Sequence, residues 1–492
     1  IRPTDAKQDL EWEGMQMFTN HRVPHDDPRM DGVYGHYEDN LTDIIETLQD
    51  KGMHVLLSTV PVNLRHSAPF LSLRSPDLSD EQIDQWREST RQGAQSASEG
   101  NWDEAIEHFQ AALAIDPGYA DTHFRLASAL EKMGNHDEAK AHYERALDLD
   151  ALRFRADTRI NHIVHEVAGR MEGDSFSFVD SAAAFERASA PFQAGWNLLL
   201  EHVHYDFAGN HLLAAEISRS IAGDMTGADD FEPLPGPETA RRIGFPNYDS
   251  IAEIENLQGM IQYPPFPGQS NYAQLAAFLG DKLQRLNGAV GSPEDLIRGR
   301  QDIVRSGYAD WKIYFELAVL NQRLRNQSAM YYHLNQIFKL YPHNRESYMK
   351  IADAMTKEGK WREVIPYLEQ SLNYTRNDEE KIAETIGWLG TAYLRTGEYE
   401  KATDLLLEVT EEYSDQIGLT LRAYGNLIKH SRERNNVTEL ERSAEDVQAY
   451  ARSLIRIGKA KEYPLLYQRM SQLMTMGGSE DEAQDWAEAQ AQ

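Results

Sequence analysis

Two neighbouring stretches of the chain repeat one pattern of small, aromatic and turn residues at a spacing of 34 residues, as from Gly100 to Gly134. A period of this length is typical of paired helices that stack on the next pair, because one pair cannot bury its apolar face alone. Small residues let paired helices approach closely, and the aromatic residues fill the space between pairs. The corresponding positions are Gly100 and Gly134, Ala105 and Ala139, Phe109 and Tyr143, and Ala112 and Ala146.

This pattern, together with Gly93 and Pro117, identifies residues 80–151 as a pair of tetratricopeptide repeats. Weaker versions return after Trp311, so residues 301–492 are predicted to form a tetratricopeptide-like α-solenoid. Its concave face would be available to a protein partner. The three best sets are Tyr314, Leu317, Ala318 and Pro342; Tyr348, Ile351, Ala352, Gly359 and Leu368; and Leu389, Gly390, Tyr393, Gly397 and Ala402.

Two segments outside the repeats predict part of a parallel sheet. Residues 53–60 (MHVLLSTV) form an unbroken apolar run after a helical pattern that ends at Gly52, as expected of a strand buried on both faces. Residues 176–179 (FSFV) follow a second helical stripe. Helix followed by strand is half of a parallel α/β unit. Residues 1–37 and 181–197 are predicted to be irregular, and the fold class is α/β plus all-α.

The stretch 201–217 (EHVHYDFAGNHLLAAEI) carries the strongest candidate chemistry. It places His202 and His204 beside Glu201, immediately before an amphipathic helix. A short polar loop that enters a helix is how an α/β sheet presents an acid–base group at its strand ends.

Three segments resemble bacterial SGNH/GDSL hydrolases that carry tetratricopeptide repeats: 40–70 (NLTDIIETLQDKGMHVLLSTVPVNLRHSAPF), 152–161 (LRFRADTRIN) and 201–214 (EHVHYDFAGNHLLA). The resemblance implies a partial flavodoxin-like sheet and an ester hydrolase or acyl transferase. In that family an Asp-x-x-His block supplies the base toward a serine nucleophile. The resemblance therefore makes His204 the base and Glu201 the carboxylate that orients it, with Glu in place of the usual Asp.

The family's nucleophile lies in a Gly-Asp-Ser motif after its first strand, and residues 1–40 contain no such strand and turn. We therefore expect the chain to be a fragment that lacks the nucleophile, without esterase activity of its own. Gly173-Asp174-Ser175 matches the motif, but a helix precedes it and a strand follows, the reverse of a nucleophile elbow. Ser175 is interpreted as a turn residue.

Other polar residues have two interpretations each. Asn63 and Arg65 follow a predicted strand and either border a substrate pocket or stabilise the loop. A zinc site at Glu201, His202 and His204 would lack a fourth ligand, so no metal or cofactor is predicted. Packing or surface roles are expected for four other histidines, His162, His165, His202 and His211.

The composition of the chain limits which classes of partner it can bind. A net charge of −30 argues against nucleic acid, since no basic surface would release phosphate counterions, and the absence of cysteine excludes thiolate chemistry. No apolar run is long enough to cross a bilayer. The location stays open, because a signal or anchor upstream of Ile1 is compatible with the sequence. The predicted segments are 1–79 and 152–223 (hydrolase-like), 80–151 (inserted repeats), 224–300 (connector with helices) and 301–492 (solenoid).

Two functions follow from this organisation. The first is an SGNH-type ester hydrolase or acyl transferase whose repeats position an acylated protein or polymer. The alternative is a tetratricopeptide scaffold or adaptor with a catalytically inactive hydrolase-like domain. A Gly-Asp-Ser after a buried strand in the upstream sequence would favour the enzyme.

Overall fold

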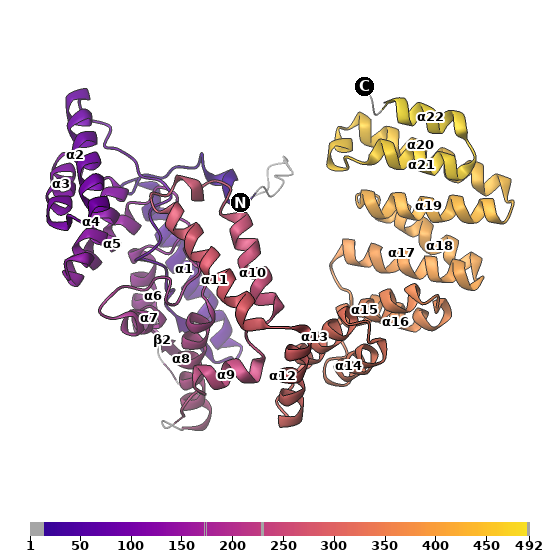
Figure 1. The fold of residues 1–492 in the computed structure, drawn as a ribbon, viewed down its shortest axis with the longest axis horizontal. Helices are drawn as coiled ribbons and strands as arrows, with labels where there is room; N and C mark the ends of the chain where they lie inside the picture. Colours follow the sequence, from indigo (N-terminus) through magenta and orange to yellow (C-terminus); the bar gives the residue numbers. More distant parts are fainter. Residues whose placement is uncertain (1–13, 172, 174, 228–230, 490–492) are drawn as a thin grey trace. The chain divides into compact units, whose positions relative to one another are not determined.

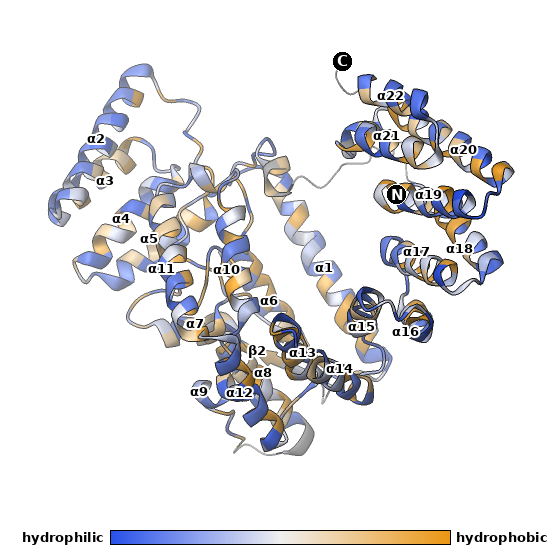
Figure 2. Ribbon diagram, turned by 45° about the vertical axis from the view of Figure 1, so that its right-hand side comes forward, coloured by the Kyte–Doolittle hydropathy of each residue, from blue (hydrophilic) through white to orange (hydrophobic). Residues whose placement is uncertain are grey.

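The computed structural model describes residues 14–171, 173, 175–227 and 231–489, which are mostly helical and form two compact units (Figure 1). Unit 1 ends at Ser292, and unit 2 begins at Pro293. The helices of both units carry a mixture of hydrophobic and hydrophilic residues (Figure 2), and most of them bury apolar side chains in the cores described below. None of the described helices combines the length and apolar character that crossing a membrane requires.

Unit 1 contains both strands of the described residues and two inserted helical hairpins. Its elements are η1 (Gly14–Phe18), α1 (Arg29–Asp50), β1 (Val55–Ser58), α2 (Asp80–Glu99), α3 (Trp102–Ile115), α4 (Ala120–Lys132), α5 (His136–Asp148), α6 (Thr158–Arg170), β2 (Phe176–Val179), α7 (Ser181–Ser189), α8 (Phe207–Thr226), α9 (Gly236–Ile243), α10 (Tyr248–Met260), η2 (Phe266–Gly268) and α11 (Tyr272–Val290).

The inserted hairpins are α2 with α3 and α4 with α5, which confirms the predicted repeat pair. Gly93 faces Phe109, and a Cβ atom at residue 93 would lie 2.7 Å from the ring. Gly100 ends α2 with φ +81°, a left-handed conformation that glycine adopts without a steric penalty. Phe109 and Tyr143 are both buried in one core with the small alanines of the four helices.

The sheet is smaller than the sequence analysis predicted. β1 and β2 pair in parallel from Val55 with Phe176 to Ser58 with Val179, and they are the two strands of the sheet in the described residues. A flavodoxin-like sheet is therefore not shown. The β1 residues are half-buried rather than buried on both faces, because each strand of a two-stranded sheet is an edge strand.

Two predicted irregular regions contain helices. α1 begins at Arg29, well before residue 37, and packs its Tyr34 and Ile45 against α6. α7 occupies the first half of the predicted loop 181–197, where the Asp180 side chain accepts from the Ala183 amide and caps the helix. The cap and the following alanines were the sequence signal for α7.

The proline-rich region after Gly223 packs on the rest of unit 1. Ile254 of α10 and Leu279 of α11 share an apolar core with Phe70 and Leu200, which belong to the two loops that form the candidate site. Helices α10 and α11 therefore hold these loops in place through apolar packing.

Unit 2 is a series of helical hairpins that follow α12. Its elements are α12 (Pro293–Ser306), α13 (Trp311–Arg323), α14 (Gln327–Leu340), α15 (Arg345–Lys357), α16 (Trp361–Tyr374), α17 (Glu379–Thr396), α18 (Tyr399–Glu412), α19 (Ile417–Glu433), α20 (Val437–Arg456), η3 (Lys459–Glu462), α21 (Leu466–Gly477) and α22 (Glu480–Ala489).

The pairs of unit 2 are α13 with α14, α15 with α16, α17 with α18, α19 with α20, and α21 with α22. Small residues lie where the paired helices meet, as Gly390 of α17 does against Leu406 of α18. A Cβ atom at residue 390 would lie 2.9 Å from the Leu406 side chain. The predicted hairpin architecture of the C-terminal region is therefore present.

Candidate functional site

Two loops of unit 1 meet beyond the carboxyl end of β1. The backbone amide of Asn63 donates to the His202 carbonyl over 3.1 Å, and the Tyr205 hydroxyl donates to the Pro61 carbonyl over 3.1 Å. The loop after β1 and the loop before α8 are therefore held at the same edge of the sheet. This is the edge at which open parallel sheets present their functional groups.

Glu201 is the central group of this junction, and its side chain is fully buried. Its carboxylate accepts from the backbone amide of His204 over 2.7 Å and also contacts that residue's Nδ1 atom. The His204 side chain is 60% exposed. A carboxylate at Nδ1 orients an imidazole and selects the tautomer whose Nε2 can accept a proton.

His202, two residues before His204, packs in the interior of the protein. It is 5% exposed, and its ring meets Phe70 and Phe266 edge-on at centroid distances of 5.1 and 5.5 Å. Burial, with the nearby charges of Arg155 and His204, lowers the pKa of His202 to about 3. In the described part of the chain no group of three or more histidine and carboxylate side chains is placed to hold a metal ion.

The two pocket candidates, Asn63 and Arg65, are engaged inside the protein. Asn63 is completely buried; its side chain donates to the Glu201 carbonyl over 2.7 Å and accepts from the His66 amide over 2.8 Å. Arg65 forms two hydrogen bonds of 2.8 Å with Glu131 of α4, and its guanidinium lies 3.9 Å from the centre of the Phe192 ring. These contacts correspond to the loop-stabilising alternative.

Ser175 lies at the opposite end of β2 from this junction. It immediately precedes the first strand residue, and its hydroxyl accepts from Gln49 Nε2 over 3.2 Å. Asp174 of the same Gly-Asp-Ser match lies outside the described residues. His211 of α8, on the other hand, contacts the Leu234 carbonyl through Nε2 over 2.8 Å.

Unit 2 contains a second candidate site on the first helices of consecutive hairpins. A cavity of about 170 Å³ lies between α17 and α19, where Trp388, Arg422 and Asn426 contribute to its wall. A second cavity of about 410 Å³ lies between α19 and α21 and is also lined by Arg422, together with Arg469. The two cavities meet at Arg422, and we refer to the surface around them as the first-helix face.

The charge of this face differs from that of the chain. The first helices α17, α19 and α21 together carry six Lys or Arg side chains and four acids, one of which, Glu384, lines the cavity beside Trp388. The basic excess lies on α19 and α21, which carry Arg422, Lys429, Arg432 and Arg469 against Glu433. The neighbouring second helix α18 carries five acids and one lysine. Within the described residues Arg422 has no carboxylate at ion-pair distance. The first-helix face therefore offers a cation that the protein does not neutralise.

Comparisons with known proteins support the repeats. The sequence model of the tetratricopeptide repeat family matches residues 96–156. No curated protein matches the chain. Among solved structures, the P58(IPK) TPR domain is 12% identical over 80% of this chain and 98% of that one, with a TM-score of 0.24. The MamA protein is 17% identical over 36% of this chain and 88% of that one, with a TM-score of 0.27. Yeast Tom70 is 11% identical over 82% of this chain and 84% of that one, with a TM-score of 0.27.

The family match at residues 96–156 identifies the inserted hairpins of unit 1 as tetratricopeptide repeats. Sequence reasoning anticipated a partner-binding face in unit 2, but it did not name Trp388, Arg422, Asn426 or Arg469. The available signal was the recurrence of basic residues on first helices in an acidic chain.

Proposed function

We propose that the protein is a tetratricopeptide scaffold that binds an acidic segment of a protein partner on the first-helix face of unit 2. The observation that carries this proposal is Arg422, an exposed cation without an acidic partner at the junction of two cavities. Trp388 offers an apolar contact beside it, and Asn426, which donates to Thr391 Oγ1 over 2.8 Å, lies in the same wall. Tryptophan and arginine are the residue types that dominate binding energy at interfaces.

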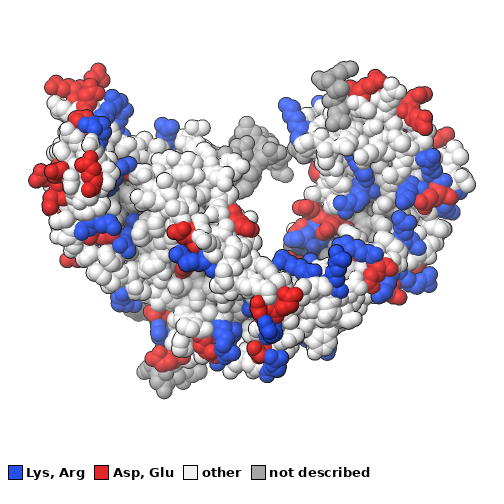
Figure 3. Space-filling model, viewed as in Figure 1, with Lys and Arg blue, Asp and Glu red and all other residues white. Residues whose placement is uncertain are grey.

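The charge distribution supports an acidic partner. The chain has a net charge of −30, and acidic side chains gather over α2 and α3 in unit 1 (Figure 3). A local basic surface in such a protein steers an acidic segment toward itself and away from the remaining acidic surface. Attraction of this kind weakens as salt is added.

The test is direct binding of a labelled peptide of alternating glutamate and leucine to the full chain, followed by fluorescence anisotropy. Arg422→Glu should weaken binding by about tenfold, because reversal of one interfacial charge costs roughly that much. Arg442→Glu on the second helix α20 is the matched control and should bind like the unaltered protein. Equal binding of a lysine–leucine peptide, or equal binding by the Arg422 variant, would contradict the proposal.

Ester hydrolysis or acyl transfer by an SGNH-type mechanism is a second candidate. The contact of buried Glu201 with Nδ1 of exposed His204 favours it, because that pair could activate a serine. No hydroxyl hydrogen-bonds to His204 in the described residues, so the nucleophile is unassigned. Labelling by a fluorophosphonate probe that disappears in His204→Ala, while Glu201 and the fold are kept, would support this candidate; equal hydrolysis of a p-nitrophenyl ester by both proteins would refute it.

A further inference from the structure

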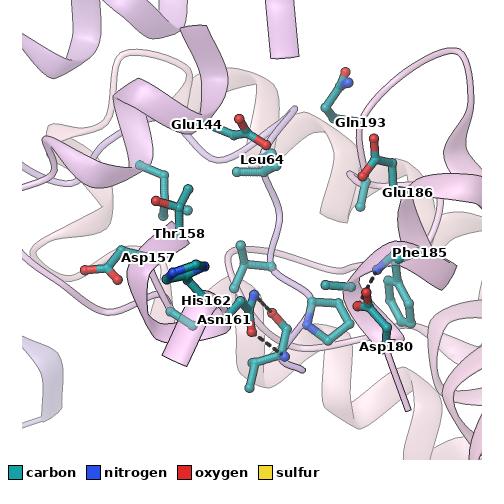
Figure 4. Close-up of a pocket in the computed structure, with 18 of the residues that line it drawn as sticks. Leu64, Glu144, Asp157, Thr158, Asn161, His162, Asp180, Phe185, Glu186 and Gln193 are labelled. Atoms are coloured by element: carbon teal, nitrogen blue, oxygen red, sulfur yellow. Dashed lines mark hydrogen bonds between the residues drawn. The ribbon is translucent and has the colours of Figure 1, made fainter. Parts of the chain in front are cut away.

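A pocket of about 340 Å³ lies in unit 1 between the sheet edge and the inserted repeats (Figure 4). Its walls come from the loop after β1, from α5 of the second repeat, from α6, and from the end of β2 with α7. The volume is within the range of small-molecule sites. Neither Glu201 nor His204 lines it, although it shares Pro61 with the junction described above.

Much of the wall is apolar. Val62 and Leu64 of the β1 loop, Leu147 of α5 and Phe185 of α7 line the pocket. A ligand with a hydrocarbon body would cover these side chains and release the water that otherwise contacts them. α5 makes the inserted repeat part of the site, since it contributes one of the apolar walls.

The polar groups at one part of the pocket are already engaged. Asp180 accepts from Thr59 Oγ1 over 2.8 Å and from the Ala183 amide over 3.0 Å, and it lies 3.2 Å from His165 Nε2. Asp157 pairs with Arg153 over 2.8 Å. These carboxylates cap α7 and α6 and are used by the fold.

Another part of the pocket has spare acceptors. Figure 4 shows Glu144, Gln193 and Glu186 around the space next to Leu64. The buried Oε1 atom of Gln193 has no hydrogen-bond partner, and the residue is 6% exposed. A buried acceptor without a donor is costly, so a rotation of the Gln193 side chain that brings its oxygen to a ligand donor in the pocket would be favoured.

Glu144 is the second spare acceptor. Its nearest cation is Lys140, 3.9 Å away, and that ammonium lies against Glu186 instead. Lys140 is the one Lys or Arg in the described wall, which also contains four carboxylates. Burial raises the pKa of Glu144 and Lys140 opposes the shift, while 39% of the Glu144 side chain stays exposed and can meet a ligand. A neutral donor would satisfy Gln193 but would leave this charge.

We propose that this pocket binds an organic cation, namely an alkylammonium group whose hydrocarbon part covers Val62, Leu64, Leu147 and Phe185 while its nitrogen donates to Glu144 and Gln193. The ligand is either a free aliphatic amine or the side chain of a lysine in another protein. Both sources share the chemistry that the pocket recognises.

The experiment is calorimetric titration of the full chain with n-hexylammonium, and with hexanol and hexanoate as neutral and anionic ligands of equal length. Hexylammonium should bind saturably and the other two should not. Saturable binding of hexanol with equal affinity, or no saturable binding of hexylammonium, would overturn the proposal.

Variants locate the site. Glu144→Gln keeps the shape of the side chain and should weaken hexylammonium binding by about tenfold, the effect of losing a charge-assisted hydrogen bond. Glu138→Gln, an exposed position on the same helix outside the pocket, should bind like the unaltered protein. Ala183→Leu fills the pocket without removing a charge and should abolish binding. Unchanged binding in both Glu144→Gln and Ala183→Leu would refute the assignment.

Titration with Nα-acetyl-lysinamide distinguishes a lysine side chain of another protein from a free amine as the ligand. Binding at least as tight as that of hexylammonium identifies a protein side chain as the ligand, whereas binding of hexylammonium alone identifies a free amine. Hydrogen–deuterium exchange should show ligand-dependent protection in α5 and α7 but not in unit 2, and protection confined to unit 2 would contradict the proposal.

Discussion

Arg65 and Glu131 form a two-point ion pair, with Nε to Oε2 and Nη2 to Oε1 distances of 2.8 Å each. Arg65 belongs to the loop after β1, and Glu131 belongs to the first helix of the second inserted repeat. The side chains are 22% and 6% exposed, so the pair is largely withdrawn from water. It connects the loop of the candidate site to the inserted repeats.

We expect a double-mutant cycle of Arg65→Met and Glu131→Gln to show a coupling free energy of about 1–3 kcal/mol. Bidentate pairs of this kind exceed the value of exposed ion pairs because both charges keep a fixed partner. Urea unfolding followed by circular dichroism measures it. The exposed pair Arg87–Asp84 on α2, 3.2 Å apart, is the control and should show almost no coupling.

Replacement of Gly93 by alanine should destabilise the α2–α3 hairpin. The added Cβ atom would lie 2.7 Å from two ring carbons of Phe109, which is buried and cannot withdraw freely. Overpacking of this type typically costs about 1–3 kcal/mol. Amide exchange in α2 and α3 should accelerate, while Gly169→Ala, where no atom lies within 4 Å, should leave these amides unchanged.

The stability of unit 1 should fall on mild acidification because of His66. Burial lowers the pKa of His66 to about 3, and its Nδ1 accepts from the Trp196 amide over 3.2 Å, which requires a neutral ring. The unfolded chain takes up this proton near pH 6.5 and the folded protein does not. Stability from this group is therefore complete above about pH 6.5 and is lost toward pH 3, by about 2 kcal/mol at pH 5.

His66→Phe tests this explanation. The ring of His66 stacks on Trp196 at a centroid distance of 4.3 Å, so phenylalanine keeps the stacking and removes the titration. The variant should lose less stability than the unaltered protein between pH 7 and pH 5, measured by urea unfolding. An identical pH dependence would show that other groups cause the loss.

Glu201 and His204 should differ in their effect on folding. The Glu201 carboxylate accepts from the backbone amides of His202, Val203 and His204, so Glu201→Ala leaves buried donors unsatisfied and should cost about 2–4 kcal/mol. His204→Ala alters an exposed ring and should cost less than about 1 kcal/mol. Thermal unfolding compares them. A large loss in His204→Ala would mean that its contact with Glu201 is structural.

Part of the fold could be predicted because the signal is local. The period of Gly, Ala and aromatic residues in the inserted repeats is written along the chain, and each hairpin packs mainly on its neighbours. The two strands were located within a few residues for the same reason. α7 was missed because its Asp180 cap and alanines were read as part of a loop. The beginning of α1 was missed although Met30, Tyr34 and Tyr37 recur at helical spacing and pack in one core with α6.

The candidate site was predicted less completely. The Glu-x-x-His spacing placed Glu201 and His204 together, and the catalytic role assigned to them stays a prediction. The burial of Asn63 and the engagement of Arg65 depend on Glu201 and Glu131, which are 138 and 66 residues away in the chain. No periodicity indicates such pairs, because they form only when distant segments of the chain fold against one another.

The sequence by itself determined the helical hairpins, the positions of the two strands and the acidic character of the chain, since these follow from the order of neighbouring residues. Only the tertiary structure decided which polar groups have hydrogen-bond or ion-pair partners inside the protein and which do not. Arg422, Glu144 and Gln193 differ from other residues of their types in the partners that folding gives or withholds, and burial makes that difference costly. The binding surfaces proposed for this protein depend on these incompletely paired groups.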